Sequence, residues 1–296
     1  MRLAVFTKNR SNPAYAAARL GAERAAALGG AEITHYVPQT PDDPGEQSAL
    51  IDEALATKPD AIVLSVVHAT RVNDAVQRIH AVGIPVTGFV NPVPVGRSAA
   101  YVGADDASLA RAMAGYLFDH LQGQGRVLVV MGPEDSVTSI DRLRGFMAAF
   151  ESRPGVTLAG QIAGGYDREK ARSAMAKWMA SNGTPDACLV ANDIMAIGVL
   201  DALDAADARS IVVGVNAIPQ AVEAIGAGRM LATADFNAMQ MAYLATDCAI
   251  RHLQGLPVPE QLELAVRIVD GSNWREWHRP YEARTLHGVT HFWSPP

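Results

Sequence analysis

The sequence predicts an α/β protein built as two lobes, each a doubly wound parallel sheet. The main observation is an internal repeat, in which three short apolar runs recur in the same order in the two halves of the chain. These runs lie at 2–6, 59–67 and 84–91, and again at 126–131, 185–193 and 211–216. Each run is rich in β-branched residues and apolar throughout, as a strand buried on both faces is. Two lobes of one design follow.

Helices are expected between the runs, where apolar residues recur with helical spacing. The stretches are 14–28, 46–56, 72–81, 139–150, 168–180 and 194–203. Alternation of strand and helix is typical of a parallel sheet, and in such sheets ligands bind beyond the carboxyl ends of the strands. We therefore expect the strand ends of the two lobes to supply the two sides of one ligand cleft.

Size and charge narrow the class of protein. The chain has 296 residues and is 49% hydrophobic, enough for two cores of about 150 residues each. Its net charge is −6 and its Lys and Arg residues are scattered, so no basic stripe exists to neutralise the phosphates of a nucleic acid. No apolar run reaches the ~18 residues that a membrane span needs.

The cysteines and the start of the chain bear on its compartment. Cys188 falls in a predicted strand and Cys248 in a predicted helix, so core thiols are favoured over a disulfide. The first strand begins almost at Met1, which leaves no room for a secretory signal. Either the protein is cytoplasmic, or the numbering describes a trimmed mature form.

Catalytic signatures are absent from the sequence. It holds no phosphate loop, no GxGxxG after the first strand, no GxSxG and no HExxH. The eight histidines are dispersed, and only His68 directly follows a predicted strand. For His68 a polar loop residue that lines or rims the cleft is favoured over a catalytic base. We predict no catalytic residue, no metal and no cofactor.

Polar residues follow the predicted strands in both halves. Asn12 and Tyr15 open the first helix, where Asn12 either caps the helix or faces a ligand, and the Tyr15 ring could stack on one. Asn91 and Asn216 end equivalent strands of the two lobes. Because an amide both donates and accepts, this pair suits hydroxyl groups better than an anion. One residue of Asn192-Asp193 is expected to cap the next helix and the other to face the cleft.

At these residues the chain resembles the type I periplasmic solute-binding proteins, in particular the ribose-like group that serves bacterial sugar ABC transporters. The motifs that carry the resemblance are Asn12-Pro-Ala-Tyr15, Gly103-Ala-Asp-Asp106, Arg142-Leu-Arg-Gly-Phe146, Tyr166-Asp167, Ala191-Asn-Asp-Ile-Met-Ala-Ile-Gly198, Val212-Val-Gly-Val-Asn216 and Leu231-Ala-Thr-Ala234. The resemblance implies capture of a solute by hinge closure and its delivery to a membrane permease, without catalysis. It also implies a periplasmic location and a monomer.

The resemblance further implies a three-strand hinge between the lobes. Carried over by position, the crossings fall near 103–106, 233–236 and 265–267. The expected first lobe is then 1–104 plus 235–265. The expected second lobe is 105–234 plus 266–296.

Departures from the ribose-like pattern bear on the ligand. Where that group has an Asp-Arg pair this chain has Val90-Asn91, and Asn216 stands where it has Asp. Phe236, preceded by Asp235, replaces the usual Gln, and the usual ligand-binding Arg matches either Ile140 or Arg142. Charged anchors are exchanged for amides and an aromatic ring. We expect a smaller or modified sugar, or a linear polyol, held between Tyr15, Tyr166 and Phe236.

Three alternatives remain open at this stage. One is the effector domain of a lactose-repressor-type regulator, which shares the fold, although the chain opens on a strand and not on a helix-turn-helix. A second is an enzyme on the same scaffold. The third concerns the aromatic tail, 273–296, which is either an apolar strap across a lobe surface or a segment that docks a partner.

Overall fold

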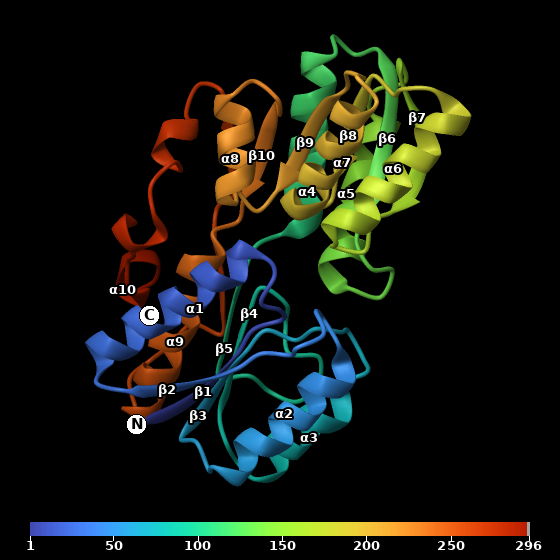
Figure 1. The fold of residues 1–296 in the computed structure, drawn as a ribbon. Helices are drawn as coiled ribbons and strands as arrows, with labels where there is room; N and C mark the ends of the chain where they lie inside the picture. Colours follow the sequence, from blue (N-terminus) through green and yellow to red (C-terminus); the bar gives the residue numbers. More distant parts are fainter. Residues whose placement is uncertain (295–296) are drawn as a thin grey trace. The chain divides into compact units, whose positions relative to one another are not determined.

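A computed structural model describes residues 1–294, and its contacts divide the chain into two compact lobes. The first lobe comprises Met1–Ala104, Asn237–Ala265 and, within the described residues, 280–294. The second comprises Asp105–Phe236 and Val266–Arg279. Figure 1 shows each lobe as a sheet with helices on both faces. The chain passes between the lobes four times, after Ala104, Phe236, Ala265 and Arg279.

The first lobe is an all-parallel sheet with strand order β11-β5-β4-β3-β1-β2. Its strands are β1 (Arg2–Phe6), β2 (Glu32–Tyr36), β3 (Ala61–Leu64), β4 (Val86–Phe89), β5 (Ala100–Gly103) and β11 (Gln261–Glu263). Its longer helices are α1 (Pro13–Gly29), α2 (Pro44–Ala56), α3 (Asn73–Ala81) and α9 (Ala238–Leu253). Helices α1 and α9 cover one face of the sheet, and α2 and α3 cover the other (Figure 1). The doubly wound prediction is confirmed.

The second lobe repeats this design with strand order β12-β10-β9-β8-β6-β7. Its strands are β6 (Gly125–Met131), β7 (Val156–Ala163), β8 (Ala187–Val190), β9 (Ile211–Val215), β10 (Ala232–Asp235) and β12 (Arg267–Asp270). Its helices are α4 (Asp106–His120), α5 (Val137–Glu151), α6 (Arg168–Asn182), α7 (Asp193–Ala205) and α8 (Pro219–Gly226). Strand β12 is antiparallel to β10, so this sheet is not parallel throughout as predicted.

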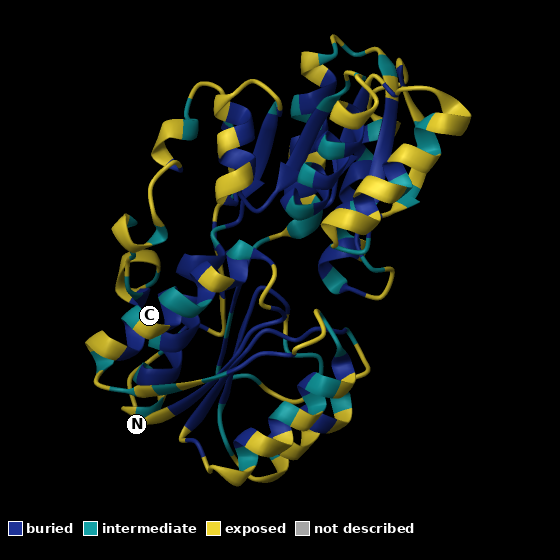
Figure 2. Ribbon diagram, in the orientation of Figure 1, coloured by how far each residue is buried: buried dark blue, intermediate teal, exposed yellow. Residues whose placement is uncertain are grey.

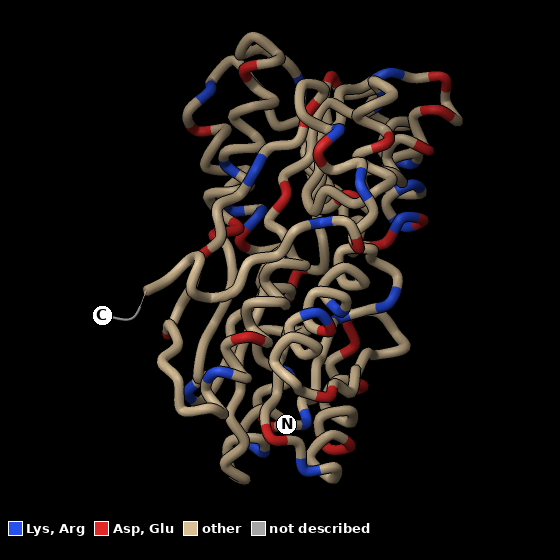
Figure 3. The backbone as a smooth tube through the Cα atoms, turned by 90° about the vertical axis from the view of Figure 1, so that its left-hand side faces the viewer, with Lys and Arg blue, Asp and Glu red and all other residues tan. Residues whose placement is uncertain are grey.

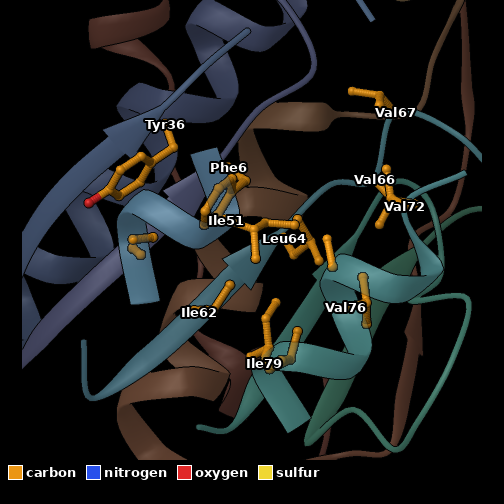
Figure 4. Packing of buried hydrophobic residues seen from close by; sticks show 14 residues of the cluster. Phe6, Tyr36, Ile51, Ile62, Leu64, Val66, Val67, Val72, Val76 and Ile79 are labelled. Carbon is orange, nitrogen blue, oxygen red and sulfur yellow. The ribbon is translucent and has the colours of Figure 1, made fainter. Parts of the chain in front are cut away.

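The cores lie between sheet and helices, because strands buried on both faces need cover on both. Figure 2 shows the central strands of both lobes buried and the outer helix faces exposed. In the first lobe one cluster of buried side chains joins the sheet to α2 and α3 (Figure 4). Within it the Phe6 and Tyr36 rings stack at 5.0 Å between centroids. This packing fixes where the strands end, and so where the loops begin.

The tail corrects the sequence-based boundaries. It follows β12 with the short turns η1 (Trp274–Glu276), η2 (Tyr281–Ala283) and α10 (Val289–Phe292). From Pro280 on it packs in the first lobe, not in the second as predicted, because Gln240 and Asp247 of α9 hydrogen-bond its backbone. Residues 235–236 belong to the second lobe, since β10 continues to Asp235. Pro295 and Pro296 lie outside the described residues.

The distribution of charge and the state of the two cysteines agree with what the sequence predicts. Figure 3 shows acidic and basic residues scattered along the chain in both lobes. Cys188 and Cys248 are free and buried, each in a different lobe, and burial raises the pKa of both thiols to about 12. None of the helices in residues 1–294 combines the length and the apolar character that a membrane span requires.

Helices α4 and α5 approach so closely that glycine is required at the contact. A Cβ atom at Gly145 of α5 would collide with the backbone carbonyl oxygen of Ala107 in α4. We expect Gly145→Ala to lower the free energy of unfolding by roughly 1–3 kcal/mol, measured by urea denaturation. Gly115 of α4 faces open space, so Gly115→Ala should stabilise by about 0.5–1 kcal/mol. If the two substitutions changed the free energy of unfolding equally, the close contact between α4 and α5 would not limit the stability of the lobe.

Candidate functional site

Asn91 lies directly beyond the carboxyl end of β4 in the first lobe. Its side chain is fully buried, and its Nδ2 donates to the backbone oxygen of Val66 at 2.8 Å. Its Oδ1 is buried too, yet accepts no hydrogen bond from any residue between 1 and 294. The preceding Val90 has φ of +64°, which is a costly conformation for a β-branched residue.

Asn216 occupies the equivalent place after β9 in the second lobe. Its Oδ1 is likewise buried without a hydrogen-bond partner in the described chain, and the residue is only 9% exposed. Asn216 and Ala217 have φ of +125° and +51°. Strained non-glycine backbone persists where surrounding structure enforces it, often at binding sites. Each lobe thus presents, at the same strand end, a buried amide oxygen beside a strained backbone.

Two further asparagines cap helices. The Oδ1 of Asn12 accepts from the backbone nitrogen of Ala14 at 3.0 Å, and that of Asn192 accepts from Met195 at 2.9 Å. Of the two roles left open for Asn12, its side-chain oxygen takes the capping role. Each amide keeps its Nδ2 to donate elsewhere. Tyr15 follows in the first turn of α1 and is 8% exposed.

His68 shapes the loop that follows β3. Its Nδ1 accepts hydrogen bonds from the backbone nitrogens of Thr70 and Arg71, at 3.0 and 3.1 Å. An accepting Nδ1 places the proton of the neutral ring on Nε2. This arrangement fits a polar loop residue.

Arg142 organises the start of α5 in the second lobe. Its Nε donates to Oδ1 of Asp106 and its Nη1 to the backbone oxygen of Ala191, both at 2.7 Å. Its guanidinium lies 5.5 Å from the centre of the Phe236 ring. Of the two positions left open by the sequence, Arg142 is buried and Ile140 is exposed, so the structure brings Arg142 to the strand ends.

Hydroxyl groups gather beside Arg142. The Tyr166 hydroxyl lies 3.0 Å from Oγ1 of Thr138, which lies 3.2 Å from Oγ of Ser136. Ser139 adds a buried Oγ with no hydrogen-bond partner among residues 1–294. Tyr166 has φ of +57°, which adds a fourth strained residue to Val90, Asn216 and Ala217 near the strand ends.

Asp193 is fully buried, and both of its carboxylate oxygens accept hydrogen bonds within the second lobe. Its Oδ1 accepts from Thr233 Oγ1 at 2.7 Å and its Oδ2 from the backbone nitrogen of Ile218 at 3.0 Å. It therefore holds the loop that presents Asn216. The sequence predicts that the residue beside the cap faces the cleft; for Asp193 both carboxylate oxygens accept hydrogen bonds within the lobe, and a contact with the ligand stays a prediction.

Burial gives Asp193 a pH dependence. It raises the pKa of the carboxyl from 3.8 to about 7, partly offset by the Thr233 and Ile218 hydrogen bonds. The folded state then binds the proton more tightly than the unfolded state, so this contribution to stability is complete below about pH 4 and is lost as the pH rises through 7. The slope is at most about 1.4 kcal/mol per pH unit.

We expect Asp193→Asn to flatten this slope, because the amide does not titrate between pH 4.5 and 8 and its oxygen can still accept one of the two hydrogen bonds. Urea denaturation of both proteins from pH 4.5 to 8 measures it. Parallel stability curves for the two proteins would contradict the assignment.

Asp235 and Phe236 end the sheet of the second lobe. Oδ2 of Asp235 accepts from Nε1 of Trp277 at 2.7 Å. Phe236 is 5% exposed and lies under the Arg142 guanidinium. Arg142 and Phe236, far apart in the sequence, are thus brought together.

Sequence reasoning missed Lys8. It follows β1 in the first lobe, is only 2% exposed, and its Nζ lies 3.4 Å from Oδ1 of Asp42. Nδ2 of Asn9 donates to the other oxygen of Asp42 at 3.0 Å. The available signal was a charged residue two positions after the end of an apolar strand. Ser65, whose buried Oγ has no hydrogen-bond partner in the described residues, was missed as well.

A metal site is not evident in the described part of the chain. No group of three or more His, Cys, Asp or Glu side chains there could hold an ion.

Comparison with known proteins identifies the family. A family model described as a periplasmic binding protein domain matches residues 3–257. The ribose import binding protein of Haemophilus influenzae is 22% identical over 267 residues, which cover 90% of each chain. The D-allose-binding periplasmic protein of Escherichia coli is 25% identical over 244 residues, 79% of this chain and 78% of its own.

Solved structures share the fold over nearly the full length. The Caulobacter myo-inositol binding protein, bound to myo-inositol, superposes with a TM-score of 0.87 at 24% identity, covering 93% of this chain and 95% of that one. The arabinose-binding component from Shewanella gives 0.88 at 19% identity, covering 97% and 100%. With most of its length matched by the family model, the chain belongs to the periplasmic binding protein family and has the type I fold of its sugar-binding members.

Proposed function

We propose that this protein is the solute-binding component of an ABC importer, and that it captures a small sugar, modified sugar or polyol at the strand ends of its two lobes. The observation that carries the proposal is the pair of buried amide oxygens, Oδ1 of Asn91 and Oδ1 of Asn216, which lack hydrogen-bond partners among residues 1–294. A buried acceptor left unpaired costs about 1–3 kcal/mol, and a ligand hydroxyl that donates to it removes this cost.

The charges nearby favour an uncharged ligand. Among residues 1–294, the two buried cations at the strand ends, Lys8 and Arg142, are each ion-paired with an acid of the same lobe, Asp42 and Asp106. Neither brings uncompensated positive charge to an anionic ligand. The proposed ligand set is Asn12, Tyr15, Lys8, His68, Asn91, Arg142, Tyr166, Asn192, Asn216 and Phe236, with Asp193 and Asp235 as supporting residues.

Relatives point the same way. Ribose, D-allose and myo-inositol appear in the names of proteins similar to this chain, and all are uncharged and rich in hydroxyls. We extend that class, and the import role, to this chain. On this proposal the protein is periplasmic and monomeric, delivers its ligand to a membrane permease and catalyses no reaction.

A thermal-shift screen tests the class of ligand. The panel contains pentoses, hexoses, amino sugars, inositols, alditols, amino acids and organic acids. A ligand at 100 times its Kd stabilises the folded protein by about 2.7 kcal/mol, a readily measured rise in Tm. We expect a rise with one or more sugars or polyols. A rise with amino acids or organic acids alone would overturn the proposal.

A further inference from the structure

The described part of the C-terminal tail, residues 273–294, is anchored firmly in the second lobe at its start. Nε1 of Trp277 donates to the Asp235 carboxylate at 2.7 Å, and the Arg267 guanidinium lies 4.5 Å from the Trp277 ring centre. Trp277 is 7% exposed. The Trp274 ring packs on Gly226 of α8, where a Cβ atom would lie only 2.9 Å from the ring. These contacts fix the tail to the end of β10.

The rest of the tail is anchored in the first lobe. The Gln240 side chain makes two hydrogen bonds with the backbone of His287: its Nε2 donates to the oxygen at 2.7 Å, and its Oε1 accepts from the nitrogen at 3.0 Å. Asp247 accepts from the nitrogen of Val289 at 2.8 Å, and Arg24 donates to the oxygen of Arg284 at 2.7 Å. The tail is thus fixed to α9 and α1.

The two sets of anchors stand on either side of one crossing. Asp235 is the last residue of β10 and Gln240 lies in the first turn of α9, while the chain passes between the lobes after Phe236. Asn237, directly after the crossing, has φ of +60° and caps α9 by accepting from the nitrogen of Gln240. In the tail, residues 278–280 alone separate Trp277 from the turn η2. Pro280 restricts this link further, because its φ is fixed.

We infer that the tail is a splint for the crossing at Phe236, with Trp277 as the residue that positions Asp235 and Phe236. Residues 278–286 of the tail, between Trp277 on β10 and His287 on α9, form a second link between the same two elements, and this link limits the backbone rotations available at 236–237. A hinge absorbs lobe motion through such rotations. For ligand capture the inference rests on the proposed function, but the splint itself is testable without any ligand.

The experiment is hydrogen–deuterium exchange on the full-length protein without ligand. Four glycine and serine residues inserted after His278 lengthen the link and leave both sets of anchors in place. We expect the amides of Gln240 and Met241 to exchange about tenfold faster, the change for a lost restraint of about 1.4 kcal/mol. The same insertion after the exposed Gly183, in a loop of the second lobe, is the matched control and should leave these amides unchanged.

Two point variants separate a splint from a surface cover. Trp277→Phe keeps the ring on Arg267 and removes the N–H donor, and Gln240→Met removes both hydrogen bonds to His287. If the tail acts as one splint, the double variant should exchange at residues 235–241 no faster than either single variant, because breaking one end already frees the link. If the two substitutions accelerated amide exchange additively, or if the insertion after His278 left the exchange rates unchanged, the tail would be a surface cover and not a splint.

Discussion

Replacing Arg142 by alanine is expected to lower the free energy of unfolding of the second lobe by about 3–5 kcal/mol, the usual cost of removing one partner from a buried ion pair. The change deprives the Asp106 carboxylate and the Ala191 carbonyl oxygen of their 2.7 Å donor. It also uncovers the Phe236 ring. Urea denaturation followed by a probe in the second lobe measures the loss.

Arg144 provides the control for this prediction. It lies on the same helix and pairs with Asp141, but its side chain is 68% exposed. Arg144→Ala should change the free energy of unfolding by no more than about 0.5 kcal/mol, because surface ion pairs contribute little. If Arg142→Ala unfolds like Arg144→Ala, the buried network around Arg142 does not support the lobe.

The second large effect is expected for ligand affinity. Asn216→Gly removes the amide whose Oδ1 is buried without a partner, so a ligand hydroxyl loses its acceptor and binding should weaken by about 1–3 kcal/mol, roughly 5- to 150-fold. The unliganded protein should be as stable as before or more so, because glycine adopts the φ of +125° at this position without strain. Titration calorimetry and a melt without ligand measure the two quantities.

Asn182→Gly serves as the comparison, since Asn182 ends an exposed helix away from the strand ends. It should leave affinity unchanged. Full affinity in Asn216→Gly would remove Asn216 from the binding site and leave it a turn residue. A lower Tm with normal affinity would support the same conclusion.

The repeat predicted the central strands and the strand-end position of both asparagines because these depend on local pattern. The edge strands β2 and β7 did not share that pattern, since their residues alternate or are largely exposed. The strain at Val90 could not be predicted, because no residue pattern around this valine indicates a positive φ. It appears only once β4, Asn91 and Val66 are packed together.

Contacts between distant residues also lay beyond the sequence. The role of Asp193 depends on Thr233, 40 residues away, and the course of the tail depends on Gln240 meeting His287, 47 residues away. No spacing rule connects such pairs. Lys8 was missed for a similar reason, because its burial follows from the position of Asp42 in a neighbouring loop.

The return of the tail has a practical consequence for sensors built from this protein. Met1 and the last described residues belong to the first lobe, and both segments of the second lobe, Asp105–Phe236 and Val266–Arg279, lie between first-lobe segments in the sequence. Two fluorophores fused to Met1 and to the end of the tail would both be attached to the first lobe. The distance between them would therefore change little if the second lobe moved. A sensor needs one fluorophore at a terminus and the other in an exposed loop of the second lobe, such as that at Gly183.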